Sequence, residues 1–294
     1  MSTLQGIQKK LKTAGDLLSV VKTMKSLASV NIRHYERAVE SLEEYNTVME
    51  MAWRVFFLST GGMPTREATG PALLLTIGTD QGMCGQFNEV VVDLVRKQDE
   101  RLASEIVHWS AGERITAALH DTGREIAQQF QLPGSLTGVD IRVKEIVSRI
   151  EQWQRERGIQ QFYLIHNKTG KRGGYRPVLY KVLPLDRNWA EQYVKKEWPR
   201  KNLPQMGAPA DVFFSHLFSQ YLYISLFRAF GQSLAGENAA RLASMQSAEK
   251  NIGEMLEKLT ARYQQQRQNE ITSELFDIVS GVEAMTGTAS EYER

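Results

Sequence analysis

The segment "IQKKLKTAGDLLSVVKTMKSLASVNIRHY", Ile7–Tyr35, opens a hydrophobic repeat that can be followed in steps of four and three residues. Thirteen of its fifteen positions are apolar. The positions are Ile7, Leu11, Ala14, Leu18, Val21, Lys25, Ala28, Ile32, Tyr35, Val39, Leu42, Asn46, Met49, Trp53 and Phe56. No proline occurs before Pro64, so the repeat predicts one helix over residues 1–58, with a coiled-coil seam roughly 75 Å long from Ile7 to Phe56.

The last third of the chain has the same spacing and no proline after Pro209. One apolar stripe runs through Met245, Ala248, Ile252, Met255 and Leu259, and a second through Ile271, Leu275, Ile278, Val282 and Met285. Between them, Gln264–Glu270 contains no apolar residue. We expect a second helix over residues 210–286, paired with the first as an antiparallel coiled coil, and a tail over residues 287–294.

The middle of the chain, residues 70–204, alternates strand and helix patterns and predicts an inserted Rossmann-like α/β domain. Strands are expected at Ala72–Ile77, Ile106–Ser110, Gln161–His166 and Val178–Val182. Helices are expected at Phe87–Gln98, Glu113–His120 and Val143–Arg155. The predicted boundaries fall in Ser59–Pro71 and Pro199–Pro209, which are rich in glycine or proline.

Composition excludes several classes of protein. The chain has 294 residues, 42% of them hydrophobic and 24% charged, with a formal net charge of +2. It is therefore a core-forming protein rather than a disordered or strongly basic nucleic-acid-binding one. The one cysteine excludes an internal disulfide and a multi-cysteine zinc site. We find no presequence pattern, and Val212–Phe227 is too short to span a bilayer, so any membrane association is expected to be peripheral.

The stretch "LLLTIGTDQGMCGQFNEVVVDLV", Leu73–Val95, has the strand, glycine turn and helix of a phosphate-binding loop. A P-loop, however, needs Lys and Ser or Thr after its last glycine, and here Gln86 and Phe87 follow Gly85. The dinucleotide pattern also fails, because Gly78, Gly82 and Gly85 have the wrong spacing. We therefore expect these glycines to allow positive φ angles and close packing of the strand against the helix, and we expect no nucleotide cofactor.

Other reactive side chains favour structural roles. Cys84 could be a nucleophile near a helix N-terminus, but no histidine is close in sequence and burial is the simpler interpretation. Asp80 has no neighbouring carboxylates with which to hold a metal, so a capping role is expected. The five histidines show no ligand spacing.

Two basic segments leave alternatives open. The glycine-rich "HNKTGKRGGYRP", His166–Pro177, suggests phosphate or RNA binding, but a solvated loop between strands is the preferred interpretation. In residues 1–37, seven Lys and Arg side chains oppose Asp16 and Glu36. This positive face could bind an acidic partner, or it could simply be exposed to solvent, and the charge alone fits both interpretations equally well.

Three segments together make the chain resemble the gamma subunit of F-type ATP synthases, over nearly its whole length. The first two are "SVVKTMKSLAS" (Ser19–Ser29) and "TDQGMCGQFN" (Thr79–Asn88). The third, and most specific, is "GENAARLASMQSAEKN" followed by "RQNEITSELFDIVSGVEAM". Within this third segment, the residues that match the family pattern in type and order are Arg241, Met245, Ala248, Arg267, Gln268, Ile271, Thr272, Glu274, Leu275, Ile278, Val279, Ser280 and Gly281.

The resemblance implies a non-catalytic rotor subunit with no cofactor, metal or direct nucleotide site. Its expected partners are three alpha and three beta subunits around the helical shaft, and the epsilon subunit and membrane c-ring at the globular foot. The complex makes or hydrolyses ATP, and the expected location is the cytoplasmic face of the cell membrane. The chain is identified with a divergent bacterial or archaeal branch.

The resemblance also implies contact residues between shaft and beta ring. It places Lys22, Met24 and Lys25 near an acidic lever of the beta subunits. It places Arg267, Gln268 and Thr272 in a contact zone higher on the shaft, where Arg267 is expected to form charge-assisted bonds to a partner carboxylate.

Two positions in the glycine turn differ from the family pattern. Gln81 stands where the family commonly has an arginine, and Gln86 stands where it commonly has a glycine.

Two other functions are compatible with the residues alone. One is a nucleotide-binding α/β enzyme with helical dimerisation arms, and the other is a coiled-coil adaptor.

Overall fold

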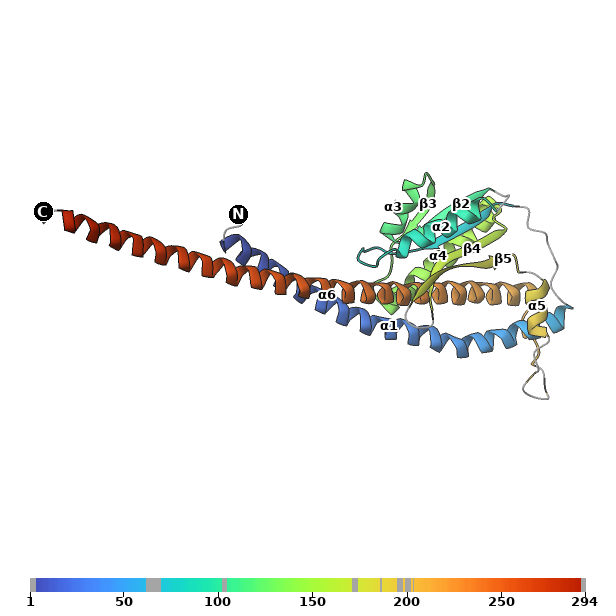
Figure 1. Ribbon diagram of the computed structural model, residues 1–294. Helices are drawn as coiled ribbons and strands as arrows, with labels where there is room; N and C mark the ends of the chain where they lie inside the picture. Colours follow the sequence, from blue (N-terminus) through green and yellow to red (C-terminus); the bar gives the residue numbers. More distant parts are fainter. Residues whose placement is uncertain are drawn as a thin grey trace. The chain divides into compact units, whose positions relative to one another are not determined.

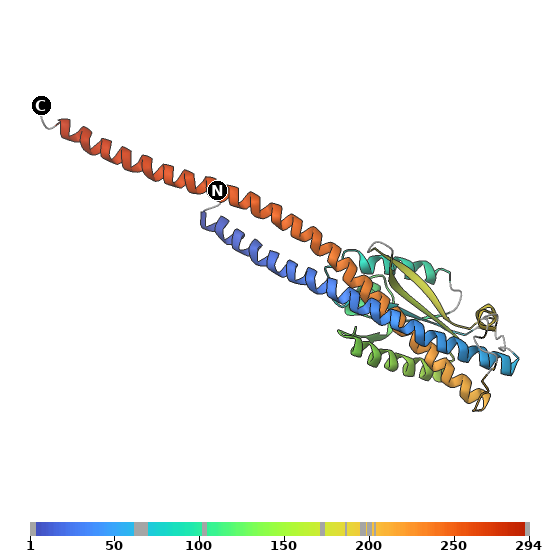
Figure 2. The same ribbon diagram turned by 90° about the horizontal axis from the view of Figure 1, so that it is seen from below.

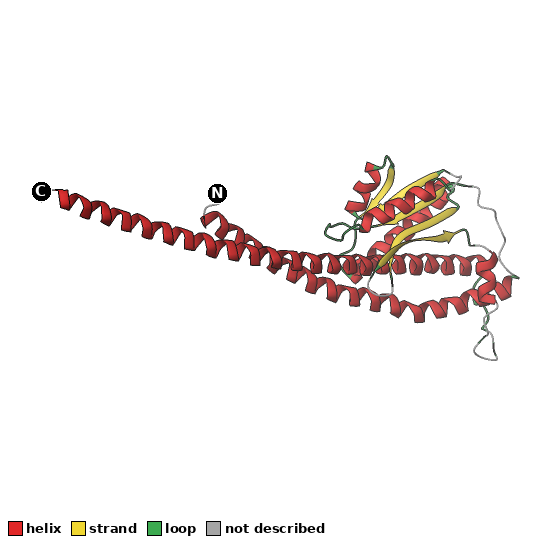
Figure 3. Ribbon diagram, in the orientation of Figure 1, coloured by secondary structure: helices red, strands yellow, loops and turns green. Residues whose placement is uncertain are grey.

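The structure is a computed structural model of the chain. It describes residues 4–61, 70–101, 105–170, 174–185, 187–194, 198, 202 and 204–291. The chain divides into two compact units: unit 1 comprises residues 1–26 and 245–294, and unit 2 comprises residues 27–244. Among the described residues, all strands belong to unit 2, while unit 1 is helical (Figure 3).

Unit 2 contains a five-stranded mixed sheet of order β3-β2-β1-β4-β5 (Figure 1). The strands are β1 (Ala72–Ile77), β2 (Ile106–Ala111), β3 (Ile126–Phe130), β4 (Gln161–Thr169) and β5 (Tyr175–Leu183). The first four are parallel, and β5 pairs antiparallel to β4. All six residues of β1 are buried, as expected for a central strand covered on both faces.

Each face of the sheet has its own helices. On one face, α2 (Phe87–Asp99) and α3 (Glu113–Asp121) pack against Ala72, Leu74 and Ile165. On the other, α4 (Leu136–Arg157) packs against Leu73, Leu75 and Ile77 together with segments of the two long helices. Ser135 caps α4 by accepting a hydrogen bond from the Gly138 N–H, and Gly158 ends it in the left-handed conformation.

The two long helices, α1 (Leu4–Thr60) and α6 (Ala210–Glu291), contribute a segment to each unit. Within unit 2 they run antiparallel (Figure 2), with hydrogen bonds from Tyr45 to Gln220 (2.8 Å) and from Asn31 to Asn238 (3.5 Å). Their ends meet in an aromatic cluster around Trp53, whose ring contacts Phe56, Phe57, Phe214 and also Trp189 on α5 (Arg187–Val194). Unit 2 thus encloses a large core of sheet and helices.

The predicted fold class is confirmed, and the seam is the part predicted best. Each of its fifteen positions in α1 is buried or half-buried, because the four-three spacing keeps them on one face of the helix. Two elements were not predicted, the edge strand β3 and the short helix α5. The polar "IAQQF" of β3 alternates in exposure, as an edge strand does.

The basic segment His166–Pro177 is mostly strand, contrary to the predicted loop. His166–Thr169 belongs to β4 and Tyr175–Pro177 to β5, leaving a short connection. Residues 171–173 of that connection lie outside the described residues, as do residues 62–69 and several between 195 and 203 in the predicted domain boundaries. In the predicted tail, the backbone of residues 287–291 is helical, and residues 292–294 lie outside the described part.

None of the described helices carries a stretch both long and apolar enough to cross a membrane.

Candidate partner-contact surface

Two of the predicted contact residues on α1 differ in their surroundings. In unit 1, the Lys25 ammonium forms an ion pair of 2.5 Å with Glu249 on α6. This hydrogen bond is the main reason that the pKa of the Glu249 carboxyl is lowered, and the charges of Lys25 and Lys22 contribute further. Lys22 itself is exposed and Met24 is half-buried. Lys25 therefore joins the two helices, while Lys22 presents its charge to solvent.

The other three predicted contact residues lie on α6. Arg267, Gln268 and Thr272 are exposed, and the Thr272 hydroxyl donates to the Gln268 carbonyl at 2.8 Å within the helix. Arg267 is eighteen residues beyond Glu249, which corresponds to roughly 27 Å along the helix axis. The six residues therefore form two separate levels of unit 1 rather than one site.

Beyond Glu270, α6 carries exposed apolar side chains over one broad face. Lys25 of α1 lies opposite Glu249 of α6, and the two helices are antiparallel. The first described residue of α1, Leu4, is 21 positions before Lys25, so it lies opposite about Glu270 of α6. No residue of α1 in the described part lies opposite the positions that follow. Ile271, Leu275, Phe276, Ile278 and Val279 are 48 to 67% exposed. We call these five residues the apolar end.

The apolar end indicates a partner protein. Contiguous exposed apolar side chains mark interaction sites on soluble proteins. The neighbouring Gln264–Glu270 segment is instead polar, with Arg267, Gln268 and Asn269 exposed. Unit 1 thus presents a polar band followed by an apolar segment.

Sequence reasoning missed a second apolar surface on α1. Leu17 and Val20 are 52% and 55% exposed in unit 1, next to the seam residues Leu18 and Val21. The signal was available in "DLLSVVKTM", where two adjacent apolar positions recur three residues apart. One member of each pair enters the seam and the other faces outward.

The glycine turn lies where a nucleotide would bind in a doubly wound sheet, at the carboxyl ends of β1 and β4. The chain leaves β1 toward β2 and leaves β4 toward β5 on the opposite side, so this is the topological switch point of the sheet. Here Cys84 and Phe87 are buried against Ala240 of α6, with Tyr175 packed beside them. The Asn167 amide on β4 also donates to the Phe87 carbonyl at 2.8 Å. The chain's own side chains therefore fill the crevice.

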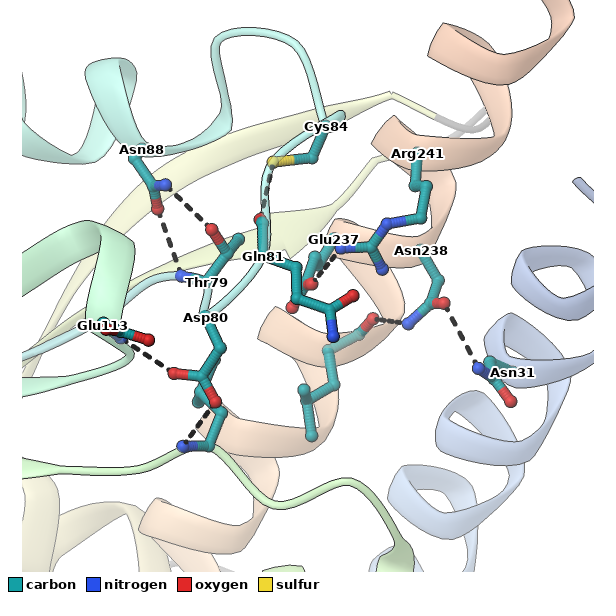
Figure 4. Close-up of polar contacts among 12 residues, drawn as sticks. Asn31, Thr79, Asp80, Gln81, Cys84, Asn88, Glu113, Glu237, Asn238 and Arg241 are labelled. Carbon is teal, nitrogen blue, oxygen red and sulfur yellow. Dashed lines mark hydrogen bonds and ion pairs between the residues drawn. The ribbon is translucent and has the colours of Figure 1, made fainter. Parts of the chain in front are cut away.

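The polar groups of the turn are also satisfied within unit 2 (Figure 4). Asp80 accepts hydrogen bonds from the backbone N–H groups of Glu113 (2.8 Å) and Leu132 (3.1 Å). Asn88 bonds both the backbone N–H and the hydroxyl of Thr79. A side chain at Gly78 would lie 2.3 Å from Cβ of Ile115. Asp80 thus has the predicted capping role, and Gly78 allows β1 to approach α3 closely.

Cys84 is buried, as expected. Burial raises the pKa of its thiol, and the Glu237 carboxylate raises it further. An activated nucleophile needs the opposite shift. Glu237 is buried and forms an ion pair of 2.6 Å with Arg241. Figure 4 shows this pair on α6, beside the turn that carries Cys84.

Comparisons with known proteins agree with this geometry. A family model described as ATP synthase matches residues 3–285. The ATP synthase gamma chain of Syntrophus aciditrophicus is 27% identical over 300 residues, covering 97% of this chain and 99% of the relative. That of Polynucleobacter necessarius is 26% identical over 294 residues, covering 97% and 100%.

Solved structures share the fold. A chain of the Euglena gracilis mitochondrial ATP synthase, described as OSCP, F1 and c-ring in rotational state 3, has a TM-score of 0.65 at 15% identity. The match covers 96% of this chain and 94% of that one. A chain from the rotor of the same organism's enzyme has a TM-score of 0.62 at 14% identity, covering 91% and 98%.

Proposed function

Because the chain belongs to the ATP synthase gamma-chain family and is thereby a central-stalk subunit of ATP synthase, we propose that its paired helices act as a rotating shaft. In this role the shaft turns inside a ring of alpha and beta subunits and changes the conformation of their catalytic sites in turn. Unit 2 connects the shaft to the epsilon subunit and to the membrane c-ring. The subunit itself is non-catalytic.

The observation that carries this proposal is the apolar end of α6. Five exposed apolar side chains on one helix need an enclosing apolar surface, which a ring of subunits around the helix provides. The polar band at Gln264–Glu270 suits a surface that must move past a partner, since apolar contacts there would favour one rotational position. The filled crevice at the glycine turn supports a role without a nucleotide of its own.

We place the predicted contact residues within this arrangement. Lys22 is an exposed cation suited to an acidic segment of the ring, with Met24 beside it and Lys25 holding the helix pair together. Arg267 and Gln268 are expected to face the ring at the polar band, and Thr272 to face it just beyond the band. The complex is expected at the cytoplasmic face of the cell membrane as a peripheral assembly, and washing at low ionic strength should release this chain together with alpha and beta subunits.

The apolar end can be tested with Leu275→Gln/Ile278→Gln. Glutamine keeps the helix propensity but removes the apolar surface. Burial of each leucine or isoleucine contributes about 1.5–3 kcal/mol, so assembly with alpha and beta subunits should weaken at least roughly tenfold. The isolated chain should melt as the wild type does. The matched control is Val48→Gln/Ile141→Gln, two exposed apolar residues of unit 2.

Reconstitution decides the proposal as a whole. Alpha and beta subunits, c-ring and stator are assembled with and without this chain, and ATP synthesis driven by an ion gradient is measured. Synthesis should require the chain. If synthesis survives its omission, or if the Leu275→Gln/Ile278→Gln variant assembles and couples like the control, the shaft role is wrong.

A further inference from the structure

A cavity of about 240 Å³ lies in unit 2, where the β4–β5 hairpin covers α6 (Figure 1). Its polar lining comes from three elements. These residues are His166 and Lys168 of β4, Arg176 and Tyr180 of β5, and Ser225, Arg228 and Gln232 of α6. None of these residues belongs to unit 1 or to the glycine turn.

The strand register brings two cations together. Lys168 pairs directly with Arg176 across the antiparallel β4–β5 ladder, so both side chains lie on the same face of the sheet. Like charges directly opposite on neighbouring strands are destabilising. Arg228 adds a third cation from α6, where Ser225, Arg228 and Gln232 recur at helical spacing on one face. The fold therefore concentrates positive charge where pairing alone disfavours it.

No carboxylate compensates this charge within the lining. The described residues that line the cavity include neither Asp nor Glu. Within the part of the chain that the structure describes, Lys168, Arg176 and Arg228 also form no ion pair. Tyr180, Ser225 and Gln232 add hydrogen-bond donors that carry no charge.

His166 forms part of the cavity wall and is 4% exposed. Its Nε2 lies 3.0 Å from Oε1 of Gln232, and its Nδ1 has no hydrogen-bond partner in the described residues. Burial, with a smaller contribution from the charge of Lys168, lowers the pKa of His166 to about 4. An anion in the cavity would neutralise the positive charge of the lining and would raise the pKa of His166 again.

We propose that this cavity binds a phosphate group, held by Lys168, Arg176 and Arg228. Arginine donates in a fork that matches the oxygens of phosphate, and lysine adds a point charge. Three cations suit a multiply charged oxyanion better than a single carboxylate. The group can come from a free phosphate compound or from a phospholipid headgroup, and the cavity admits a small group rather than a folded element.

The test uses the purified full chain and inorganic phosphate, titrated by calorimetry at constant ionic strength. The cavity variant is Lys168→Gln/Arg176→Gln. The matched control is Arg96→Gln/Lys97→Gln, which removes one arginine and one lysine from the exposed surface of α2. Loss of two charge-assisted contacts should weaken phosphate binding at least about tenfold, whereas the control should bind like the wild type.

Three further measurements define the ligand. Sulfate should compete with phosphate, and acetate should not. NMR titration of the His166 ring should show its pKa rising when phosphate is added to the wild-type chain. The chain is also sedimented with vesicles containing phosphatidic acid and, for comparison, with phosphatidylcholine vesicles. If the wild-type chain sediments with the phosphatidic acid vesicles and the cavity variant alone does not, the ligand is a lipid headgroup. If the wild-type chain binds inorganic phosphate but does not sediment with these vesicles, the ligand is a free phosphate compound.

Several results would overturn the proposal. One such result is a wild-type chain that melts normally but binds no phosphate at millimolar concentration. Alternatively, both double variants lose binding equally, which means that general charge is responsible. Acetate binding as tight as phosphate binding would indicate a carboxylate site, and cavity-dependent binding of an RNA oligonucleotide without phosphate binding would indicate a nucleic-acid surface.

Discussion

The same two long helices pack into a large shared core in unit 2 but bury few of their side chains in unit 1. In unit 2, α1 and α6 pack through Trp53 and Phe230 into a core shared with the sheet. In unit 1, the seam contributes Ile7 and Ala14 as buried side chains, and the Lys25–Glu249 ion pair joins the helices. The difference teaches that unit 2 is stabilised by its own residues, whereas unit 1 leaves its surface for partners.

The largest effect is expected from Trp53→Ala in unit 2. Trp53 is 2% exposed and contacts four aromatic rings, so its truncation should lower the free energy of unfolding by about 3–5 kcal/mol. Denaturant unfolding followed by circular dichroism measures this loss. The comparison breaks down if Leu275→Ala, on the exposed apolar end, is equally destabilising.

Arg241→Ala should be nearly as damaging. It leaves the Glu237 carboxylate buried without its partner, which is expected to lower the free energy of unfolding by about 3 kcal/mol. Chemical denaturation of the variant tests this. The same truncation at Arg96, whose contact with Asp93 is exposed at 3.7 Å, should change stability by less than about 0.5 kcal/mol. Equal losses would mean that burial of the pair is unimportant.

Acid should destabilise unit 2 through His166. Its pKa in the folded chain, about 4, lies below the ordinary value of 6.5, so the unfolded chain binds the proton more readily. Stability is complete above pH 6.5 and falls as the pH drops toward 4, by about 2 kcal/mol between pH 7 and pH 5. Unfolding of His166→Gln, compared across this window, should lack that component. His120→Gln, at an exposed position, should retain it.

The smallest effect on stability is expected at the polar band of unit 1. Arg267→Ala/Gln268→Ala should change the free energy of unfolding by less than about 0.5 kcal/mol because both side chains are exposed. Coupled ATP turnover of the reconstituted complex should nevertheless fall. The control is Arg149→Ala/Gln152→Ala, an exposed Arg–Gln pair on α4. A large shift in melting temperature with normal coupled turnover would make Arg267 and Gln268 structural residues.

The local features of the fold could be predicted from the periodicity of apolar residues. The features that depend on which segments pair in space could not. The seam through Ile7 and Trp53, the central strand Ala72–Ile77 and the glycine turn all follow from residue spacing. The edge strand Ile126–Phe130 was missed because its polar residues give a weak strand pattern.

The surfaces depend on which residues lie opposite each other, and spacing alone does not provide this. Both stripes of α6 have the same period, but the described residues of α1 lie beside the first stripe alone. The cavity likewise arises because the ladder pairs Lys168 with Arg176 and brings Arg228 across from α6. In the sequence, the basic hairpin looked like a solvated loop.

The long separation of Lys25 from Glu249 also matters while the chain is being made. The two residues are 224 positions apart, and a ribosome adds roughly 5–20 residues per second. The N-terminal helix therefore waits on the order of ten seconds or more for its partner, with Ile7 and Ala14 uncovered. During that time the seam of the first helix is exposed apolar surface, which is the kind of surface that makes incompletely folded chains prone to aggregate.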